Sequence, residues 1–354
     1  MVVVQDVIFE DSVANIPELG GKVVAITGTT SGTGYWTAIA SIRKGAKVLI
    51  NLNRQSSRSE KAEAAFKEEV TRCGTNTAVV TIPCDLMSLE SVRNAAVQVN
   101  QLVSEHSGLD VLINNAGIFM MEDERTEDGF DVTMQVNHLS HFLLTSLLLD
   151  SLMKAADERG DARIVNHSSI ARWIGPPLTS EYFSQSEKGT LGGNASLAKM
   201  NRYHFSKLCN ALFTMALHKK FQEKGFPNMK ALVADPGLAA TEIFEKQDME
   251  GVIGSTYKIF AHRIIPLQSP ADGAVPLITA SFGSDVKSGD FLAPSKLGIT
   301  GEPKVVVREG ERVDKRFINS YWEKYVVDDS QQNLMWLKSE EVLDVKFFQE
   351  LESK

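Results

Sequence analysis

The stretch KVVAITGTTSGTG, residues 22–34, decides the fold class of this chain. It begins with an apolar, β-branched run that predicts a buried strand, and a helical pattern follows its last glycine. Glycines between a strand and a helix allow a tight turn and let the main chain approach a pyrophosphate, which the amides of the helix N-terminus can hold. A plain strand-to-helix turn is the alternative interpretation. The candidate pyrophosphate-binding residues of this turn are Gly28, Thr30, Ser31, Gly32, Thr33 and Gly34.

Further apolar, β-branched runs follow along the chain and alternate with longer segments of helical period. These runs are residues 47–52, 77–82, 110–113, 162–166 and 229–234. Strands that alternate with helices imply right-handed crossovers and a parallel sheet that is covered on both faces. We therefore predict an α/β fold with a single Rossmann-type, doubly wound parallel sheet.

The length of 354 residues is by itself compatible with two domains, but a doubly wound sheet can exceed the average domain size as one unit. The sequence shows no linker, internal repeat or low-complexity tract. We predict one domain over residues 1–354 with its core at 20–295. Residues 170–198, rich in Gly, Ser and Pro, are expected to form an insertion, and the charged residues 301–354 a C-terminal extension.

Composition and charge exclude several classes of function. The 37 Lys and Arg residues against 45 Asp and Glu give a net charge of −8, which argues against a nucleic-acid-binding surface. The cysteines, Cys73, Cys84 and Cys209, have neither metal-ligand spacing nor the pattern of a disulfide framework, so we expect no metal site. The N-terminus lacks a basic signal-peptide region, and no apolar run approaches the ~18 residues that span a bilayer. We expect a cytoplasmic protein without an integral membrane segment.

The end of the second predicted strand bears on the choice of cofactor. A dinucleotide site that prefers NAD places Asp or Glu here to bind the ribose 2′-hydroxyl. Residues 51–58 read NLNRQSSR instead, with no acid and with Arg54 and Arg58, which suit a 2′-phosphate. NADP(H) is therefore the predicted cofactor. Two solvated arginines at the start of a helix are the alternative.

A tyrosine and a lysine are the candidate acid–base pair. Tyr203 and Lys207 lie four residues apart in a helical pattern, so both side chains leave the same face. An ammonium group near a phenol lowers the pKa of the phenol and makes it a usable acid or base near neutral pH. The same spacing also occurs for a surface aromatic beside a solvated lysine, but the position of this helix after the fifth strand favours the chemical role.

Taken together and in this order, the motifs resemble those of the short-chain dehydrogenases/reductases. The shared residues are Thr27-Gly28-x-x-x-Gly32-x-Gly34, Asn114-Asn115-Ala116-Gly117, Asn137, Ser168-Ser169 and Tyr203-x-x-x-Lys207. The branch of the retinol dehydrogenases and WW-domain oxidoreductase looks closest, through QVNHLSHFLLT at 135–145 and SKLCN at 206–210. The resemblance covers almost the whole chain.

This resemblance implies that the protein interconverts a carbonyl and an alcohol by hydride transfer with NADP(H). Tyr203 would be the general acid or base, and Lys207 would bind the nicotinamide ribose and lower the pKa of Tyr203. Ser169 would hold the substrate oxygen; Ser168 is the weaker candidate because strand alternation turns it away. Asn137 would anchor a water molecule that links Lys207 to solvent.

The resemblance also implies cofactor contacts beyond the first turn. These are Asp85, Leu86, Asn115, Ala116, Gly117, Tyr203, Lys207, Pro236, Gly237 and Thr241. Asp85 would contact the adenine, although it could equally cap the helix that begins near Ser88. Thr241 would reach the nicotinamide amide or a phosphate, and a helix cap is its alternative role.

The chain departs from the family pattern at a few positions. Thr33 stands where an aliphatic residue is usual, Asp235 stands where close relatives carry His, and Arg54 falls one place later than the usual basic residue. Ser169 and Tyr203 are 34 positions apart, which is a longer spacing than in many relatives. Protochlorophyllide reductase is a relative that also has a long insertion there, and we expect the insertion to wall the substrate pocket.

Apolar residues around the expected site favour a bulky lipophilic aldehyde, ketone or alcohol as substrate. They are Phe119, Met120, Met121, Trp173, Ile174, Pro176, Pro177, Ile243, Phe244 and Met249. Simple packing under loops is their alternative role. Two other functions stay open: an NADP(H)-binding scaffold or redox sensor with little turnover, and a pigment double-bond reductase of the protochlorophyllide-reductase type. Family members commonly pair through the helices that carry Asn137 and Tyr203, so the resemblance leaves a homo-oligomer open.

Overall fold

The computed structural model describes residues 7–173, 175–239, 267–309, 311–312 and 323–348. In this part of the chain one sheet has the strand order β3-β2-β1-β4-β5-β6-β7-β8-β9. The bounds are β1 Val23–Thr27, β2 Val48–Asn53, β3 Ala78–Pro83, β4 Val111–Asn114, β5 Ala162–His167, β6 Met229–Ala234, β7 Phe291–Lys296, β8 Thr300–Arg308 and β9 Glu311–Arg312. The strands from β3 to β7 are parallel, and β8 and β9 extend one edge antiparallel. The predicted Rossmann-type sheet is confirmed.

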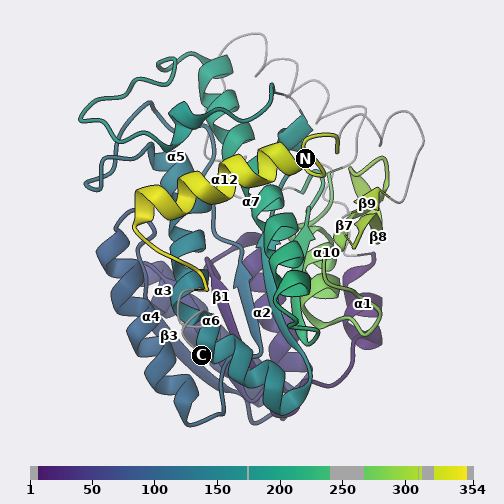
Figure 1. Cartoon of the computed structure of the whole chain (residues 1–354). Coiled ribbons are helices and arrows are strands. Elements are labelled where there is room, and N and C mark those ends of the chain that lie inside the picture. The colour runs from purple at the N-terminus through teal and green to yellow at the C-terminus, as the bar shows by residue number, and fades with distance from the viewer. Residues whose placement is uncertain (1–6, 174, 240–266, 310, 313–322, 349–354) are drawn as a thin grey trace.

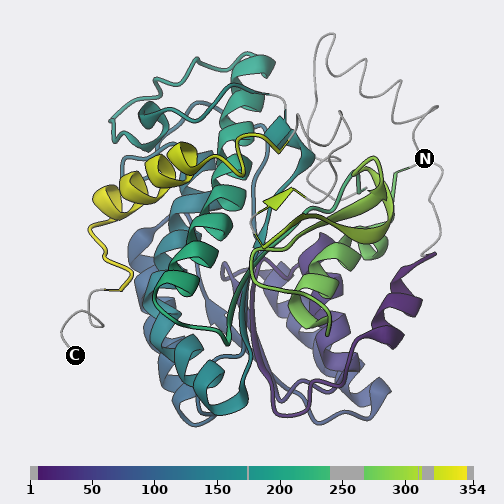
Figure 2. The ribbon, with the colours of Figure 1, turned by 45° about the vertical axis from the view of Figure 1, so that its right-hand side comes forward.

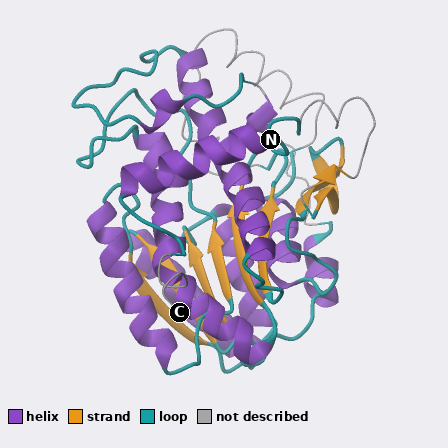
Figure 3. Ribbon diagram, viewed as in Figure 1, coloured by secondary structure: helices purple, strands orange, loops and turns teal. Residues whose placement is uncertain are grey.

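Helices cover both faces of this sheet (Figures 2 and 3). One face carries α1 Phe9–Asn15, α2 Gly32–Arg43, α3 Ser57–Cys73 and α10 Pro270–Phe282. The other face carries α4 Leu89–Ser104, α6 Ser140–Arg159 and α7 Ser196–Glu223. The central strand β1 is buried along its whole length, as two-sided coverage requires. Each helix layer encloses its own apolar core against the sheet.

Local sequence signals set the ends of α3. The Ser56 side chain accepts a hydrogen bond from the main-chain N of Ser59 and so caps the first turn. Gly74 follows the last turn with φ +66°, the left-handed conformation that glycine adopts most easily. These caps explain why the helix begins and ends at these residues.

The predicted insertion and C-terminal extension both pack on the core. The insertion contains the 3₁₀ turns η2 (Ile170–Trp173) and η3 (Ser180–Phe183), and the extension contains α12 (Asp329–Leu343). Helix α12, yellow in Figures 1 and 2, lies against α7. Trp336 of α12 meets Phe142 of α6 with ring centroids 5.3 Å apart, so the extension shares the core of one helix layer. The first residues of the extension contribute β8 to the sheet.

The carboxyl ends of the parallel strands meet at one edge of the sheet, on the side where the insertion lies (Figure 3). In doubly wound sheets this edge is where ligands bind. Among the residues that the structure describes, none of the helices is both long and apolar enough to cross a membrane.

Candidate active site

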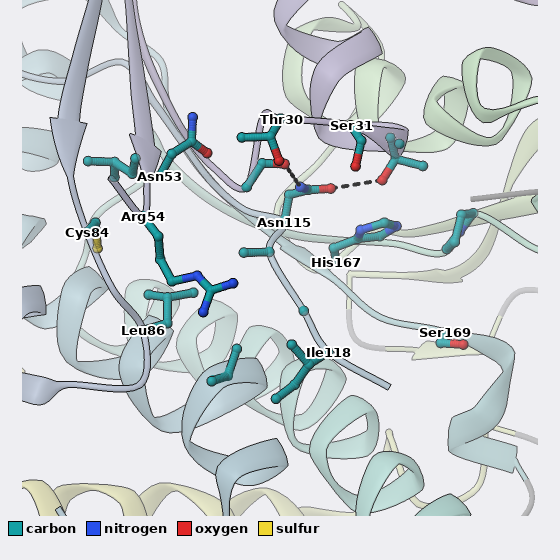
Figure 4. A pocket seen from close by; sticks show the side chains of 18 of the residues that line it. Thr30, Ser31, Asn53, Arg54, Cys84, Leu86, Asn115, Ile118, His167 and Ser169 are labelled. Atoms are coloured by element: carbon teal, nitrogen blue, oxygen red, sulfur yellow. Dashed lines mark hydrogen bonds between the residues drawn. The ribbon is translucent and has the colours of Figure 1, made fainter. Parts of the chain in front are cut away.

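A cavity of about 300 Å³ opens at the carboxyl ends of the strands (Figure 4). The predicted site residues that line it are Gly28, Thr30, Ser31, Gly32, Thr33, Arg54, Arg58, Asp85, Leu86, Asn115, Ala116, Gly117, Ser169, Tyr203, Lys207, Pro236 and Gly237. Gly34 and Asn137 do not line it, and Thr241 lies outside the described residues. The structure thus places most of the predicted site residues around one cavity.

At two positions of the glycine-rich turn the absence of a side chain allows close packing. Gly28 has φ +72°, and a Cβ there would lie 2.8 Å from the Cβ of Ala116. A Cβ on Gly34 would lie 2.3 Å from Asn115 Nδ2, so this glycine allows the close packing of helix against strand. Ser31 precedes α2 without capping it through its side chain, unlike Ser56 before α3. The first amides of α2 are therefore available to an anion.

Asn115 ties the ends of β1 and β4 together beneath the cavity. Its Nδ2 donates to the main-chain oxygens of Thr27 (2.9 Å) and Gly28 (3.0 Å). Its Oδ1 accepts a hydrogen bond from the Thr33 hydroxyl at 2.9 Å. This bond gives the physical reason for a threonine where an aliphatic residue is usual in the family.

The end of β2 presents two arginines to the cavity. Asn53 is buried, and both ends of its amide are hydrogen-bonded to Thr29. Its Oδ1 accepts from the main-chain N of Thr29 at 2.9 Å, and its Nδ2 donates to the Thr29 hydroxyl at 2.8 Å. Arg54 and Arg58 are exposed and line the cavity, and Arg58 Nη2 donates to Ser31 Oγ at 3.3 Å. Figure 4 shows Arg54 and Ser169 on opposite sides of the pocket, with Asn115 and His167 between them.

Asp85 lines the cavity but does not cap α4. Ser88 is the N-cap and accepts a hydrogen bond from the main-chain N of Ser91 at 3.2 Å. The Asp85 carboxylate instead accepts a hydrogen bond from the main-chain N of Met87 at 3.0 Å. The alternative role of Asp85 as a helix cap is therefore wrong.

Helix α7 places Tyr203 and Lys207 at the inner end of the cavity. Both side chains are buried, and Lys207 Nζ lies 5.9 Å from the centroid of the Tyr203 ring. Ser169 lies beside Tyr203 and acts to lower the pKa of its phenol. The Ser168 hydroxyl donates to the main-chain oxygen of Lys207 at 2.8 Å, which leaves Ser169 as the serine beside Tyr203.

Burial is the largest influence on the pKa values of Tyr203 and Lys207. It raises the pKa of Tyr203, and the neighbouring Ser169 side chain offsets part of that rise. The net direction is opposite to the lowering that we expected from Lys207. Burial also lowers the pKa of Lys207 to about 8, while the negative charge of Asp235 acts to raise it. Tyr203 therefore holds its proton at neutral pH and is a phenol, not a phenolate.

Asn137 lies in a π-helical turn, η1 (Gln135–Leu139), between α5 (Val132–Met134) and α6. Its Oδ1 accepts from the main-chain N of Ile118 at 2.8 Å, and its Nδ2 donates to the Ile118 oxygen and to Ser206 Oγ. Such turns inside helices are frequent at functional sites. Here the turn lets Asn137 hold the loop that follows β4. Its link to a bound water stays a prediction.

His167 lines the cavity and was missed in the sequence. It is buried, its Nε2 has no hydrogen-bond partner among the described residues, and burial with the nearby Lys207 charge lowers its pKa to about 3. The available signal was its place at the carboxyl end of a parallel strand, directly before Ser168. Other lining residues that the sequence did not single out are Leu52, Asn53, Ser56, Cys84, Met87, Ile118, Val136 and Ala239.

The predicted substrate-pocket residues are only partly brought together. Phe119 and Met120 form a buried cluster with Ala171 and Tyr203, and the rings of Phe119 and Tyr203 meet edge-on at 4.6 Å. Met120 has φ +56°, a strained conformation for a residue with a side chain. The predicted residues that do not line the described cavity are Phe119, Met120, Met121, Trp173, Pro176 and Pro177. Ile174, Ile243, Phe244 and Met249 lie outside the described residues.

Comparisons with known proteins give consistent matches. Residues 22–186 match the profile of the short chain dehydrogenase family. Mouse (Mus musculus) retinol dehydrogenase 12 is 32% identical over 79% of this chain and 79% of its own length, and mouse retinol dehydrogenase 14 is 35% identical over 78% of each chain. A crystal structure of a protein from Mycobacterium paratuberculosis superimposes with a TM-score of 0.65 and 28% identity, and the match covers 95% of this chain and 98% of that one.

Proposed function

The chain belongs to the short-chain dehydrogenase/reductase family, in the branch of the retinol dehydrogenases, and on this premise we propose that it is an NADPH-dependent carbonyl reductase. It interconverts a bulky, lipophilic aldehyde or ketone and the corresponding alcohol. The observation that carries the proposal is the convergence of Ser169, Tyr203 and Lys207 on the same cavity as the glycine-rich turn and Arg54. A proton donor and a dinucleotide cradle are thus adjacent.

The cavity fits a dinucleotide. Gly28 keeps the turn free of a side chain, and the uncapped start of α2 offers amides to a pyrophosphate. Gly117 keeps the floor open, since a Cβ there would lie 3.2 Å from both Asn137 Oδ1 and Lys207 Nζ. When bound, the reduced nicotinamide would supply the hydride.

The preference for NADPH rests on the end of β2. No carboxylate follows this strand within residues 51–58, and Asn53 is held by Thr29. Arg54 and Arg58 can donate charge-assisted hydrogen bonds to a 2′-phosphate. Their exposure is compatible with this role, because the adenosine end of the cavity opens to solvent beside them.

The chain supplies the proton chemistry of the reduction. The Ser169 hydroxyl would hold the carbonyl oxygen, and Tyr203 would donate its phenolic proton to that oxygen as it becomes negatively charged. The raised pKa of Tyr203 keeps this proton in place until charge develops on the substrate. General acid catalysis of this kind contributes about 10²- to 10⁴-fold to a rate. The ammonium group of Lys207 would stabilise the phenolate that remains.

The apolar cluster beside Tyr203 supports a lipophilic substrate. Phe119 and Met120 are buried next to the phenol, and Met200 packs against them. These side chains do not line the described cavity, but they pack with Tyr203, which does, and so make the surroundings of the phenol apolar.

The experiment is to follow NADPH consumption in the dark against lipophilic aldehydes, ketones and quinones, with NADH in parallel. Tyr203→Phe is the test variant, and Tyr182→Phe, another buried tyrosine, is its matched control. We expect turnover with NADPH that disappears only in Tyr203→Phe. NADPH binding without turnover would instead favour a scaffold or redox sensor, and turnover only under illumination would favour a pigment double-bond reductase.

A further inference from the structure

His141 is a buried histidine of α6 whose ring contacts two segments of the candidate site. Its Nε2 lies 2.9 Å from the hydroxyl oxygen of Thr27, the last residue of β1. Its Nδ1 lies 3.1 Å from the main-chain oxygen of Asn137 in the turn η1. The histidine is 1% exposed, and the threonine is fully buried. One imidazole thus joins the strand that leads into the glycine-rich turn to the turn that carries Asn137.

The other hydrogen bonds of Thr27 determine where its hydroxyl proton points. Its Oγ1 accepts hydrogen bonds from the main-chain N atoms of Asn115 and Ala116, each at 3.0 Å. A hydroxyl group has two lone pairs and one proton, so these two bonds leave only the proton to donate. His141 Nε2, at 2.9 Å, is nearer to Oγ1 than the main-chain oxygen of Ile113, at 3.4 Å. The hydroxyl therefore donates to Nε2, and Nε2 carries no proton.

The second ring nitrogen of His141 faces an acceptor. A main-chain oxygen cannot donate, so the contact of Nδ1 with the Asn137 oxygen requires a proton on Nδ1. The partners of the two nitrogens thus specify one form of the ring, which is neutral, with its proton on Nδ1 and a free lone pair on Nε2. Burial lowers the pKa of His141 to about 4, which agrees with a neutral ring at neutral pH. A charged ring would turn a second N–H toward Thr27, whose lone pairs are already occupied.

Both partners of His141 hold the same stretch of the cavity wall. Residues 115–118 line the cavity. Thr27 accepts the hydrogen bonds of the first two main-chain N atoms of this stretch. The Asn137 side chain binds the last residue, Ile118, at its main-chain N (2.8 Å) and its main-chain oxygen (3.0 Å). The stretch is therefore held at one end by Thr27 and at the other by Asn137, and His141 connects the two supports.

We propose that His141 is a positioning residue of the candidate site, which as the Nδ1-protonated imidazole joins Thr27 to Asn137 and so fixes residues 115–118. It acts through these two partners and does not itself line the described cavity. Its effect on cofactor binding rests on the proposed function. The form of the ring and its effect on the main chain do not.

The first test is NMR of the imidazole nitrogens in the full-length chain labelled with ¹⁵N-histidine, at neutral pH and without cofactor. Two-bond proton–nitrogen correlations distinguish a ring protonated on Nδ1 from one protonated on Nε2 and from a charged ring. The signals of His141 are those lost in His141→Phe. Thr27→Val gives a second assignment, because it removes the proton that Nε2 accepts and should shift the Nε2 signal. We expect the Nδ1-protonated form, and either of the other two forms would overturn the proposal.

The second test is amide hydrogen exchange of Asn115 and Ala116 in the same cofactor-free protein. His141→Phe keeps a buried ring and removes both hydrogen bonds, so we expect these amides to exchange about tenfold faster. His138→Phe is the matched control, because His138 is also fully buried but contacts Ser339 of α12 at 2.8 Å instead. It should leave both amides unchanged. Unchanged exchange in His141→Phe, or an equal acceleration in the two variants, would overturn the proposal.

Cofactor binding provides a third reading. Because residues 115–118 line the cavity, the dissociation constant of NADPH should rise about tenfold in His141→Phe and stay unchanged in His138→Phe. Unchanged binding in His141→Phe would overturn the positioning role. If the unsubstituted protein binds no NADPH, the proposed function fails, while the form of the ring and the amide exchange still decide the role of His141. If turnover depends on Tyr203 but the His141 ring carries its proton on Nε2, only the role of His141 fails.

Discussion

Nζ of Lys207 donates a hydrogen bond to the main-chain oxygen of His167 at 3.1 Å. Nδ2 of Asn210, one turn along α7, donates to the same oxygen at 3.0 Å. The end of β5 thus fixes the ammonium group relative to the strand that leads to Ser169. We predict that Lys207→Met lowers the kcat of NADPH-dependent reduction by about 100-fold or more, because the charge that stabilises a Tyr203 phenolate is lost.

The control for this variant is Lys219→Met on the same helix, where the lysine is half-exposed and paired with Asp329. Lys219→Met should leave kcat unchanged. Steady-state kinetics with circular dichroism decide the matter, and a folded Lys207→Met enzyme with more than a tenth of the original kcat would contradict the assigned role.

Arg54 tests the cofactor preference. Arg54→Ala should weaken NADPH binding by about tenfold or more, since a charge-assisted hydrogen bond to a phosphate is lost, and should leave NADH binding unchanged. Isothermal titration with both cofactors measures the two dissociation constants. Arg72→Ala, at the far end of α3, is an exposed control that should change neither. An equal loss for NADH would show that Arg54 does not read the 2′-phosphate.

Gly28 tests the glycine-rich turn against a matched glycine. Gly28 and Gly74 both have φ near +70°, but a Cβ on Gly28 would lie 2.8 Å from Ala116, whereas a Cβ on Gly74 meets nothing within 4 Å. Gly74→Ala should lose only about 1–2 kcal/mol of stability from backbone strain. Gly28→Ala should lose more and should also fail to bind NADPH. Thermal unfolding and NADPH fluorescence measure both effects, and normal binding by Gly28→Ala would exclude the turn as the pyrophosphate site.

Buried histidines make stability depend on pH. Burial lowers the pKa of His138 and His167 to about 3 and that of His141 to about 4, from 6.5 in the unfolded chain. Below pH 6.5 the unfolded chain binds more protons than the folded chain does. The contribution of these histidines to the free energy of unfolding is therefore complete above pH 6.5 and decreases as the pH falls toward 4.

Urea unfolding at several pH values measures the slope of the free energy of unfolding against pH. The slope should decrease by about 1.4 kcal/mol per pH unit between pH 6 and 4 in His138→Asn, which removes one of the three groups. His138 shares a hydrogen bond with Ser339 of α12, so the variant will also lower stability at every pH, but the slope reports the proton alone. An unchanged slope would contradict the assignment of His138 as neutral in the folded protein.

The sequence predicted the sheet well because its signals are local. The run predicted at 162–166 is β5 (Ala162–His167), and the one at 229–234 coincides with β6. The motifs that follow these strands converge because parallel strands end at one edge. The antiparallel strands β8 and β9 were not predicted, because an edge strand depends on its partner and not on its own periodicity.

Side-chain contacts between residues far apart in the sequence could not be predicted from the pattern of residue types. Arg172 and Glu323 form a buried ion pair but are 151 positions apart, and in sequence each is an ordinary charged residue that one would place in solvent. The pKa of Tyr203 is raised and not lowered for a similar reason: its burial involves residues from the loop after β4 and from η2, which are distant in the sequence. Thr33 could be noted as unusual in the sequence, but its partner Asn115 could not be identified.

The central claim is that Tyr203 protonates a carbonyl while NADPH reduces it. The most direct measurement uses NADPH deuterated at C4 with the best lipophilic carbonyl, and detects the alcohol by mass spectrometry. The account predicts one deuterium on the carbinol carbon, and a rate about 100-fold or more lower in Tyr203→Phe with NADPH binding unchanged. An alcohol without deuterium, or a Tyr203→Phe enzyme that forms it at the original rate, would contradict the account.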